Sequence, residues 1–128
     1  MLKNAPVTPI LPATDIERAK KFYTEKLGLT VSPSQEPGGI MFEAGMGSKL
    51  YIYQRAPVKV EHTQANFEVQ DIEAEMAELR GRGVVFEEYD FPGLKTVNGV
   101  AEMGDGFKAA WFKDSEGNIL ALGQSTKK

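Results

Sequence analysis

The side chains of this sequence that could do chemistry occupy every second position of one short segment, Gln64, Asn66 and Glu68. Successive side chains of a β-strand point to opposite faces, so this spacing places two amides and a carboxylate on one face. A carboxylate there must be solvated, paired with a cation such as Lys49, or held away from water. Held away from water, Glu68 could act as a general base that removes a proton next to a carbonyl group. Solvated or paired, it would only orient a polar ligand.

His62 is the only histidine of the chain, and it precedes Gln64 by two residues. In a strand, the two side chains would therefore point to the same face. At a rise of ~3.3 Å per residue, the two Cα atoms lie about 7 Å apart. One interpretation is a solvated histidine at the start of the strand. The other is an acid–base group at the rim of a pocket, or a ligand of an atypical metal site together with Glu68. The sequence leaves both open.

Aromatic side chains could form the walls of a pocket for a flat small molecule. Tyr51 and Tyr53 alternate along one strand candidate and so share a face, whereas the sequence does not fix the register of Trp111. Aromatic residues on strands can equally be plain core. Phe91 and Lys95 belong to a turn-rich segment that could close over the pocket, where Lys95 would meet an anion or simply be solvated.

Composition excludes several other functions. The net charge is −3 and the basic residues are scattered, so no patch marks a nucleic-acid or membrane surface. The absence of cysteine excludes disulfides, thiol nucleophiles and thiolate–metal sites. No glycine-rich loop opens a helix, and a single histidine without a nucleophile-elbow pattern gives no Ser-His-Asp arrangement. No apolar run resembles a membrane span or a signal peptide, so we expect a cytoplasmic protein.

The elements that must position these residues form a repeat. Asp15-Ile16-Glu17 recurs 56 residues later as Asp71-Ile72-Glu73, each time between a short apolar run and a helical pattern. We expect one helix to about residue 27, with Thr14 as N-cap and Glu17 completing a capping box, and a second helix that Asp71 caps. The expected strands are residues 7–13, 29–31, 39–43 and 49–54, with turns at Pro33, Pro37-Gly38 and 45–48, and then 64–70, 84–89, 97–103, 107–113 and 119–123.

The two halves correspond to a first module of about residues 5–56 and a second of about 62–124, with a connector at Ala56-Pro57. Because halves of this size would be marginal alone, we expect a single domain, residues 1–128, with a shared core. The segment 90–96 has no counterpart in the first half, and an insertion of that kind is where binding loops occur.

Three motifs in this order resemble the vicinal oxygen chelate superfamily, the glyoxalase, bleomycin-resistance and extradiol-dioxygenase relatives. They are Thr14-Asp15-Ile16-Glu17-Arg18-Ala19 continuing to Leu27-Gly28-Leu29, then Phe67-Glu68-Val69-Gln70-Asp71-Ile72-Glu73, and Trp111-Phe112-Lys113-Asp114-Ser115-Glu116-Gly117-Asn118-Ile119-Leu120. The resemblance implies an α+β fold of two βαβββ modules, whose mixed sheets form a half-open barrel around a cavity. It also implies a homodimer, because a second subunit commonly completes the cavity in this superfamily.

Metal-dependent members of the superfamily take ligands from the opening and closing strands of each module. By resemblance these positions are Thr8, Tyr51, Gln64 and Ala121. A divalent metal needs imidazole, carboxylate or several good oxygen donors, and here only the Gln64 amide approaches that requirement. We therefore predict no metal site and no cofactor, with a divalent metal as the alternative.

These observations predict a small-molecule binding protein of the glyoxalase/bleomycin-resistance type. The predicted ligand-binding residues are Thr8, Tyr51, Tyr53, Gln64, Asn66 and Glu68, with His62, Phe91 and Lys95 at the rim. The alternative is an enzyme: a glyoxalase-like lyase, isomerase or dioxygenase with substituted metal ligands, or a metal-free catalyst that uses Glu68 as its acid–base group.

Overall fold

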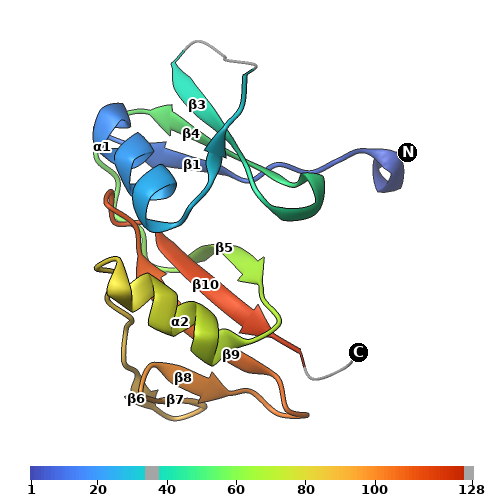
Figure 1. The fold of residues 1–128 in the computed structure, drawn as a ribbon, viewed down its shortest axis with the longest axis vertical. Coiled ribbons are helices and arrows are strands. Elements are labelled where there is room, and N and C mark those ends of the chain that lie inside the picture. The colour runs from blue at the N-terminus through green and yellow to red at the C-terminus, as the bar shows by residue number, and fades with distance from the viewer. Residues whose placement is uncertain (34–37, 126–128) are drawn as a thin grey trace. The chain divides into compact units, whose positions relative to one another are not determined.

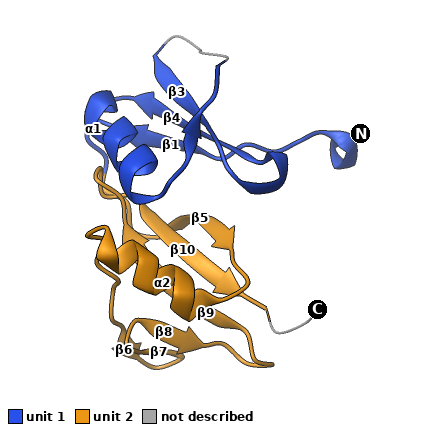
Figure 2. Ribbon diagram, in the orientation of Figure 1, with its two compact units in different colours: residues 1–58 blue, residues 59–128 orange. Residues whose placement is uncertain are grey.

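The structure is a computed structural model, and it describes residues 1–33 and 38–125 of the chain (Figure 1). The chain divides into two compact units, residues 1–58 (unit 1) and 59–128 (unit 2) (Figure 2). In each unit a β-sheet carries a helix on one of its faces. The sequence-based prediction of a single domain stays a prediction.

Two aspartates 56 residues apart begin the two main helices. Asp15 accepts a hydrogen bond from the Arg18 backbone N–H at 3.0 Å, and Asp71 accepts one from Ala74 at 3.1 Å. These bonds satisfy backbone donors that have no partner within the helix. The prediction of Thr14 as the first N-cap is therefore wrong, because its hydroxyl accepts from the Arg18 guanidinium instead.

Unit 1 has the order βαβββ. Its elements are η1 (Leu2–Asn4), β1 (Ile10–Ala13), α1 (Ile16–Lys21), the π-helical turn η2 (Phe22–Lys26), β2 (Thr30–Val31), β3 (Gly39–Glu43), η3 (Gly45–Gly47) and β4 (Lys49–Gln54). The sheet order is β1-β4-β3-β2, with β1 parallel to β4 and the other pairs antiparallel. The third and fourth strands match their predicted bounds, whereas β1 begins three residues later than expected. Of the predicted turn Pro37-Gly38, Pro37 lies outside the described residues.

The core of unit 1 lies between its sheet and α1–η2. Alternate strand residues face the helix and are buried, namely Leu11, Ala13, Ile40, Phe42, Leu50 and Ile52. The Tyr23 ring stacks on Phe42 with ring centroids 5.3 Å apart. Burying one large apolar side chain contributes roughly 1.5–3 kcal/mol, so this alternating row supplies most of what holds α1 on the sheet.

Unit 2 repeats the plan with one addition. Its elements are β5 (Thr63–Glu68), α2 (Ile72–Gly81), β6 (Asp90–Phe91), β7 (Leu94–Val97), β8 (Val100–Glu102), β9 (Lys108–Lys113) and β10 (Ile119–Gln124). The sheet order is β5-β10-β9-β8-β7-β6, and β5 pairs in parallel with β10, as β1 does with β4. The fold class is therefore α+β with two βαβββ modules, and the β6–β7 hairpin is extra.

Three predictions for unit 2 are corrected. Residues 84–89 are not a strand, because Phe86 makes only an isolated bridge to Phe112. Residues 97–103 are not one strand, because Asn98 and Gly99 have φ of 54° and 83° and turn the chain between β7 and β8. Asn-Gly with two positive φ values is the favoured two-residue hairpin turn. The segment 90–96 is a paired hairpin rather than a free loop.

The core of unit 2 lies between the sheet and α2. It contains Ile72, Met76 and Leu79 of the helix and, from the strands, Ala110, Phe112, Leu120 and Leu122, all buried. Phe86 packs edge-on against Phe112 with centroids 5.5 Å apart. In the described part of the chain, no helix has the length and apolar character needed to cross a bilayer.

The caps give a stability prediction. Replacing Asp15 or Asp71 with alanine should lower the free energy of unfolding by about 1 kcal/mol each, because a backbone N–H at each helix start loses its acceptor. Thr14→Ala, the matched control, should cost clearly less than Asp15→Ala. Urea unfolding followed by circular dichroism measures all three, and an equal or larger loss for Thr14→Ala would contradict the cap assignment.

Candidate functional site

The face of the unit 2 sheet opposite α2, called here the helix-free face, carries two of the predicted polar residues, Asn66 and Glu68. Residues paired across neighbouring strands point to the same side. Asn66 pairs with Ala121, and Ala121 pairs with Trp111. Their neighbours Phe67, Leu122 and Ala110 form the next row, and Leu122 and Ala110 are buried in the α2 core. Asn66, Ala121 and Trp111 therefore lie together on the helix-free face.

Small residues form the floor of this face. The row next to Trp111 runs from Glu68 through Gly123 and Ala109 to Ala101. Ala101, Ala109 and Ala121 are buried, and a Cβ added to Gly123 would lie 3.0 Å from the Asn66 side chain and from the Phe107 ring. Because these residues have no side chain larger than a methyl group, the larger side chains around them project farther from the sheet. The small residues are called the floor below.

An aromatic wall stands on one side of that floor. The Tyr89 ring meets the Trp111 ring edge-on at 5.6 Å and the Phe91 ring edge-on at 5.8 Å. Tyr89 is held in place by backbone hydrogen bonding with Thr96, whose N–H donates to the Tyr89 carbonyl at 2.9 Å. Trp111 is half-buried and Phe91 is 54% exposed, so the wall passes from the interior of the unit to its surface.

Tyr89 remains a hydrogen-bond donor in this setting. Burial, with a smaller contribution from the Glu87 carboxylate, raises the pKa of the Tyr89 phenol above its ordinary value. Desolvation and a nearby negative charge both disfavour the phenolate. The neutral O–H is therefore kept over a wider pH range than in a solvated tyrosine.

The polar residues of this face differ in their surroundings. Asn66 and Glu68 are exposed, so Glu68 is not held away from water. Lys49, suggested above as its partner, instead pairs with Glu43 at 3.5 Å. Gln64 lies at a β-bulge, where the register of β10 shifts against β5, and its buried Oε1 accepts no hydrogen bond from any described residue.

Unit 1 has its own helix-free face. Tyr51 pairs with Ile10 and Met41, and Tyr53 pairs with Pro12 and Gly39. Both tyrosines line an open groove of about 650 Å³ together with Ile10, Gly38 and Gln54. The Tyr51 ring lies over Gly39, since a Cβ at that glycine would be 2.5 Å from the Tyr51 hydroxyl oxygen. Thr8 is half-buried and precedes β1.

The three predicted rim residues lie in different parts of unit 2. His62 is exposed in the bend before β5, and Phe91 belongs to the aromatic wall. Lys95 lines a groove beside α2, on the other side of the sheet. Its role as a rim residue of the site that contains Glu68 stays a prediction, and the groove beside α2 is the one that the structure shows it lining.

The four positions that correspond to the superfamily's metal ligands do not fit a metal ion. Thr8 and Tyr51 offer neutral hydroxyl groups, Gln64 offers one amide, and Ala121 has no donor atom. Within residues 1–33 and 38–125, no cluster of three or more His, Asp or Glu side chains could hold a metal.

Comparisons with known proteins agree with this architecture. Residues 7–45 match the model of the bleomycin resistance protein-like N-terminal family. An integron cassette protein from the mobile metagenome of the Halifax Harbour sewage outfall superposes with a TM-score of 0.72 at 17% identity, over 94% of this chain and 98% of that one. TnmS3, an antibiotic binding protein from Streptomyces sp. CB03234, gives 0.68 at 22% identity, over 98% and 99% of the two chains. A glyoxalase/bleomycin resistance protein/dioxygenase from Alicyclobacillus acidocaldarius gives 0.66 at 18%, over 97% and 93%.

The fold is that of the glyoxalase/bleomycin resistance/dioxygenase proteins. This fold and the match of residues 7–45 support the resemblance to the vicinal oxygen chelate superfamily that the sequence shows. The comparison with curated protein sequences gives no match.

Sequence reasoning named Trp111 and Phe91 as candidates but missed Tyr89, which joins them, and the small residues of the floor. The signal was present in the turn Asp114-Ser115-Glu116-Gly117-Asn118, whose length fixes the pairing of β9 with β10. Counting back from that turn pairs Trp111 with Ala121. Tyr89 had no such signal, since its position depends on the β6–β7 hairpin.

Proposed function

We propose that this protein binds a flat small molecule on the helix-free face of unit 2 and belongs functionally to the bleomycin-resistance type. The observation that carries the proposal is the low floor of Ala109, Ala121 and Gly123 beside the ring of Trp111. A planar ligand lying on small residues can contact an aromatic edge or face, and such contacts are worth about 0.5–1.5 kcal/mol beyond the area buried.

Polar groups around the floor would orient the ligand. Asn66 offers both a donor and an acceptor, and Glu68 offers an acceptor. Gln64 is the third predicted polar residue of β5, and its buried Oε1 accepts no hydrogen bond from any described residue. Tyr51 and Tyr53, with Thr8 beside them, give unit 1 a face of similar character.

The relatives support binding more than they specify a ligand. TnmS3 is an antibiotic binding protein, and the family that matches residues 7–45 is described by bleomycin resistance. The catalytic alternative needs Glu68 away from water, and its exposed position does not supply that. The homodimer and the cytoplasmic location stay predictions of the sequence.

Binding should be visible through Trp111, the only tryptophan. When aromatic antibiotics, metal-free bleomycin included, and aromatic metabolites are screened by thermal shift, every compound that stabilises the protein should also change the tryptophan emission. The physical reason is that the ligand contacts the indole directly. Compounds that raise the melting temperature without changing the emission, or a panel with no stabilising compound, would contradict the proposal.

A matched pair of variants sharpens this test. Asn66→Leu should weaken the ligand about fivefold or more through the loss of one hydrogen bond. Ala74→Leu, at an exposed position of α2, should leave the affinity unchanged. Glu68→Gln should also retain binding within a few-fold, because an exposed acceptor that only orients the ligand is replaced by an amide oxygen.

We also propose that no metal takes part. Protein purified without chelator should contain no stoichiometric metal by elemental analysis. Its melting temperature should not rise with Mn²⁺, Fe²⁺, Ni²⁺ or Zn²⁺, since tight binding to the folded state must stabilise it. A tightly held ion that is lost when Gln64, Tyr51 or Thr8 is replaced with alanine would overturn this part of the account.

A further inference from the structure

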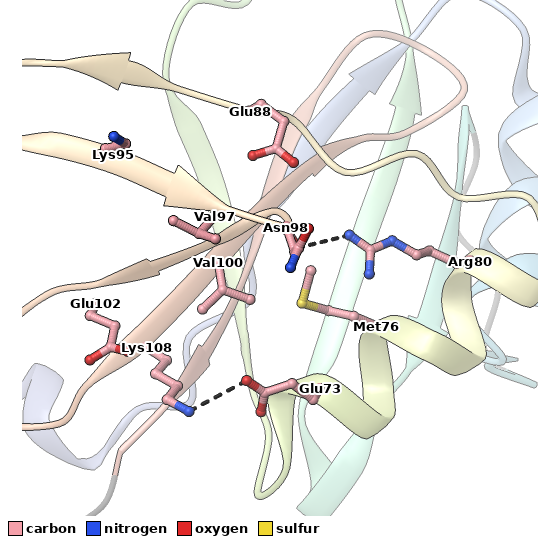
Figure 3. A pocket seen from close by; sticks show the side chains of 10 residues that line it. All are labelled: Glu73, Met76, Arg80, Glu88, Lys95, Val97, Asn98, Val100, Glu102 and Lys108. Atoms are coloured by element: carbon pink, nitrogen blue, oxygen red, sulfur yellow. Dashed lines mark hydrogen bonds and ion pairs between the residues drawn. The ribbon is translucent and has the colours of Figure 1, made fainter.

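A groove lies on the α2 side of the unit 2 sheet, between α2 and the strands β7 and β8 (Figure 3). Its volume is about 730 Å³, within the range of small-molecule pockets. It exists because α2 packs on β9 and β10, whereas β7 and β8 extend the sheet beyond the helix. Val97 on this extension is 65% exposed.

Two rows of side chains with different character line the groove side by side. Val97 pairs with Val100, and next to them on the helix lies Met76, giving an apolar strip. The adjacent row is charged. Glu102 pairs with Lys108, and the register that pairs Thr96 with Ala101 places Lys95 directly opposite Glu102.

Two of the cations in the groove are already engaged. Lys108 forms an ion pair with Glu73 at 3.4 Å. Arg80 donates to the Asn98 carbonyl at 2.9 Å and stands 5.2 Å from the centre of the Phe86 ring. Lys108 and Arg80 therefore hold the sides of the groove in position, and their charges already have partners.

Lys95 and Glu102 differ from the other charged residues of the groove. Within the described part of the chain, neither side chain has a hydrogen bond or an ion pair, and both are exposed. Residues directly opposite on antiparallel strands have Cβ atoms roughly 5 Å apart. The two residues thus occupy neighbouring positions of β7 and β8 at the end of the apolar strip, while their charged ends point apart, that of Glu102 toward Lys108 (Figure 3).

We propose that this groove binds a free α-amino acid with a large apolar side chain. An α-amino acid carries a carboxylate and an ammonium on one carbon, and the long side chains of Lys95 and Glu102 can both reach a ligand that lies between them. Its side chain would lie along Val97, Val100 and Met76. The lining has three acidic and three basic residues, so its charges balance, which favours a zwitterion over an anion or a cation.

The test uses L-leucine and L-phenylalanine as probes on the full chain, with NMR chemical shifts of the Val97 and Val100 methyl groups as the readout. Both amino acids should shift these signals in a saturable manner. N-acetyl-L-leucine, which lacks the ammonium, and L-leucinamide, which lacks the carboxylate, should bind at least about tenfold more weakly, as charge-assisted hydrogen bonds require. Glycine, which lacks the apolar side chain, should not bind measurably.

Substitutions distinguish specific binding in this groove from non-specific binding. Lys95→Gln and Glu102→Gln should each weaken L-leucine about tenfold or more, and both positions are exposed, so folding should be retained. Lys113→Gln, at an exposed position of β9, is the matched control and should leave the affinity unchanged. The proposal is overturned if neither amino acid shifts the valine signals, if N-acetyl-L-leucine binds as well as L-leucine, or if folded Lys95→Gln binds it normally.

Discussion

The hydrogen bonds between Asp114 and Asn118 set the register on which the helix-free face of unit 2 depends. The Asp114 carboxylate accepts from the backbone N–H groups of Glu116 and Asn118 and from the Asn118 side-chain amide, each at 2.8 Å. Asp114 and Asn118 are 7% and 1% exposed. Leaving such a buried carboxylate or amide without its partners costs about 1–3 kcal/mol per group, so a slipped turn is strongly disfavoured. The turn therefore determines which residues of β9 and β10 share a face.

From that register the rest of the face follows. Trp111 comes to lie opposite Ala121, and the small residues Ala109 and Gly123 form the adjoining pair. A shift by one residue would exchange the two faces of β10, placing Leu120 and Leu122 on the helix-free face. Because those leucines are buried against α2, the hydrophobic core and the turn specify the same arrangement.

The two modules keep one frame and differ in what they place on it. In both, the opening strand pairs in parallel with the closing strand and an aspartate caps the helix. The closing strand carries Tyr51 in unit 1 and Ala121 at the corresponding position in unit 2. Because unit 2 has a methyl group where unit 1 has a tyrosine ring, the sheet surface beside Trp111 is left without a large side chain at this position. Neither residue is a metal ligand of the kind that divalent ions prefer.

The alternation of Asn66 and Glu68 is enough to predict that they share a face, because a strand allows only two directions for its side chains, whereas Gln64 lies at a bulge that interrupts the alternation. The repeat predicted the module order for the same reason: local patterns of period 2 and 3.6 are properties of the chain itself. The sides of the sheet on which Trp111 and Lys95 lie could not be predicted in this way. They depend on two hairpins, and in one of them the Asn98-Gly99 turn lies inside a segment whose residues are otherwise typical of a strand. Thr14 fits the spacing of a capping box, whereas the helix begins one residue later and Asp15 is its N-cap.

The pairing of Trp111 with Ala121 is therefore the claim that carries the account, and backbone NMR measures it directly. Asp114 donates its N–H to the Asn118 carbonyl, so pairs alternate from there and Trp111–Ala121 is a pair without backbone hydrogen bonds, in which the two Cα atoms lie close together. We expect a strong nuclear Overhauser effect between the α-protons of Trp111 and Ala121. A strong effect from Trp111 to the α-proton of Leu120 or Leu122 in its place would contradict the register and remove the proposed binding face.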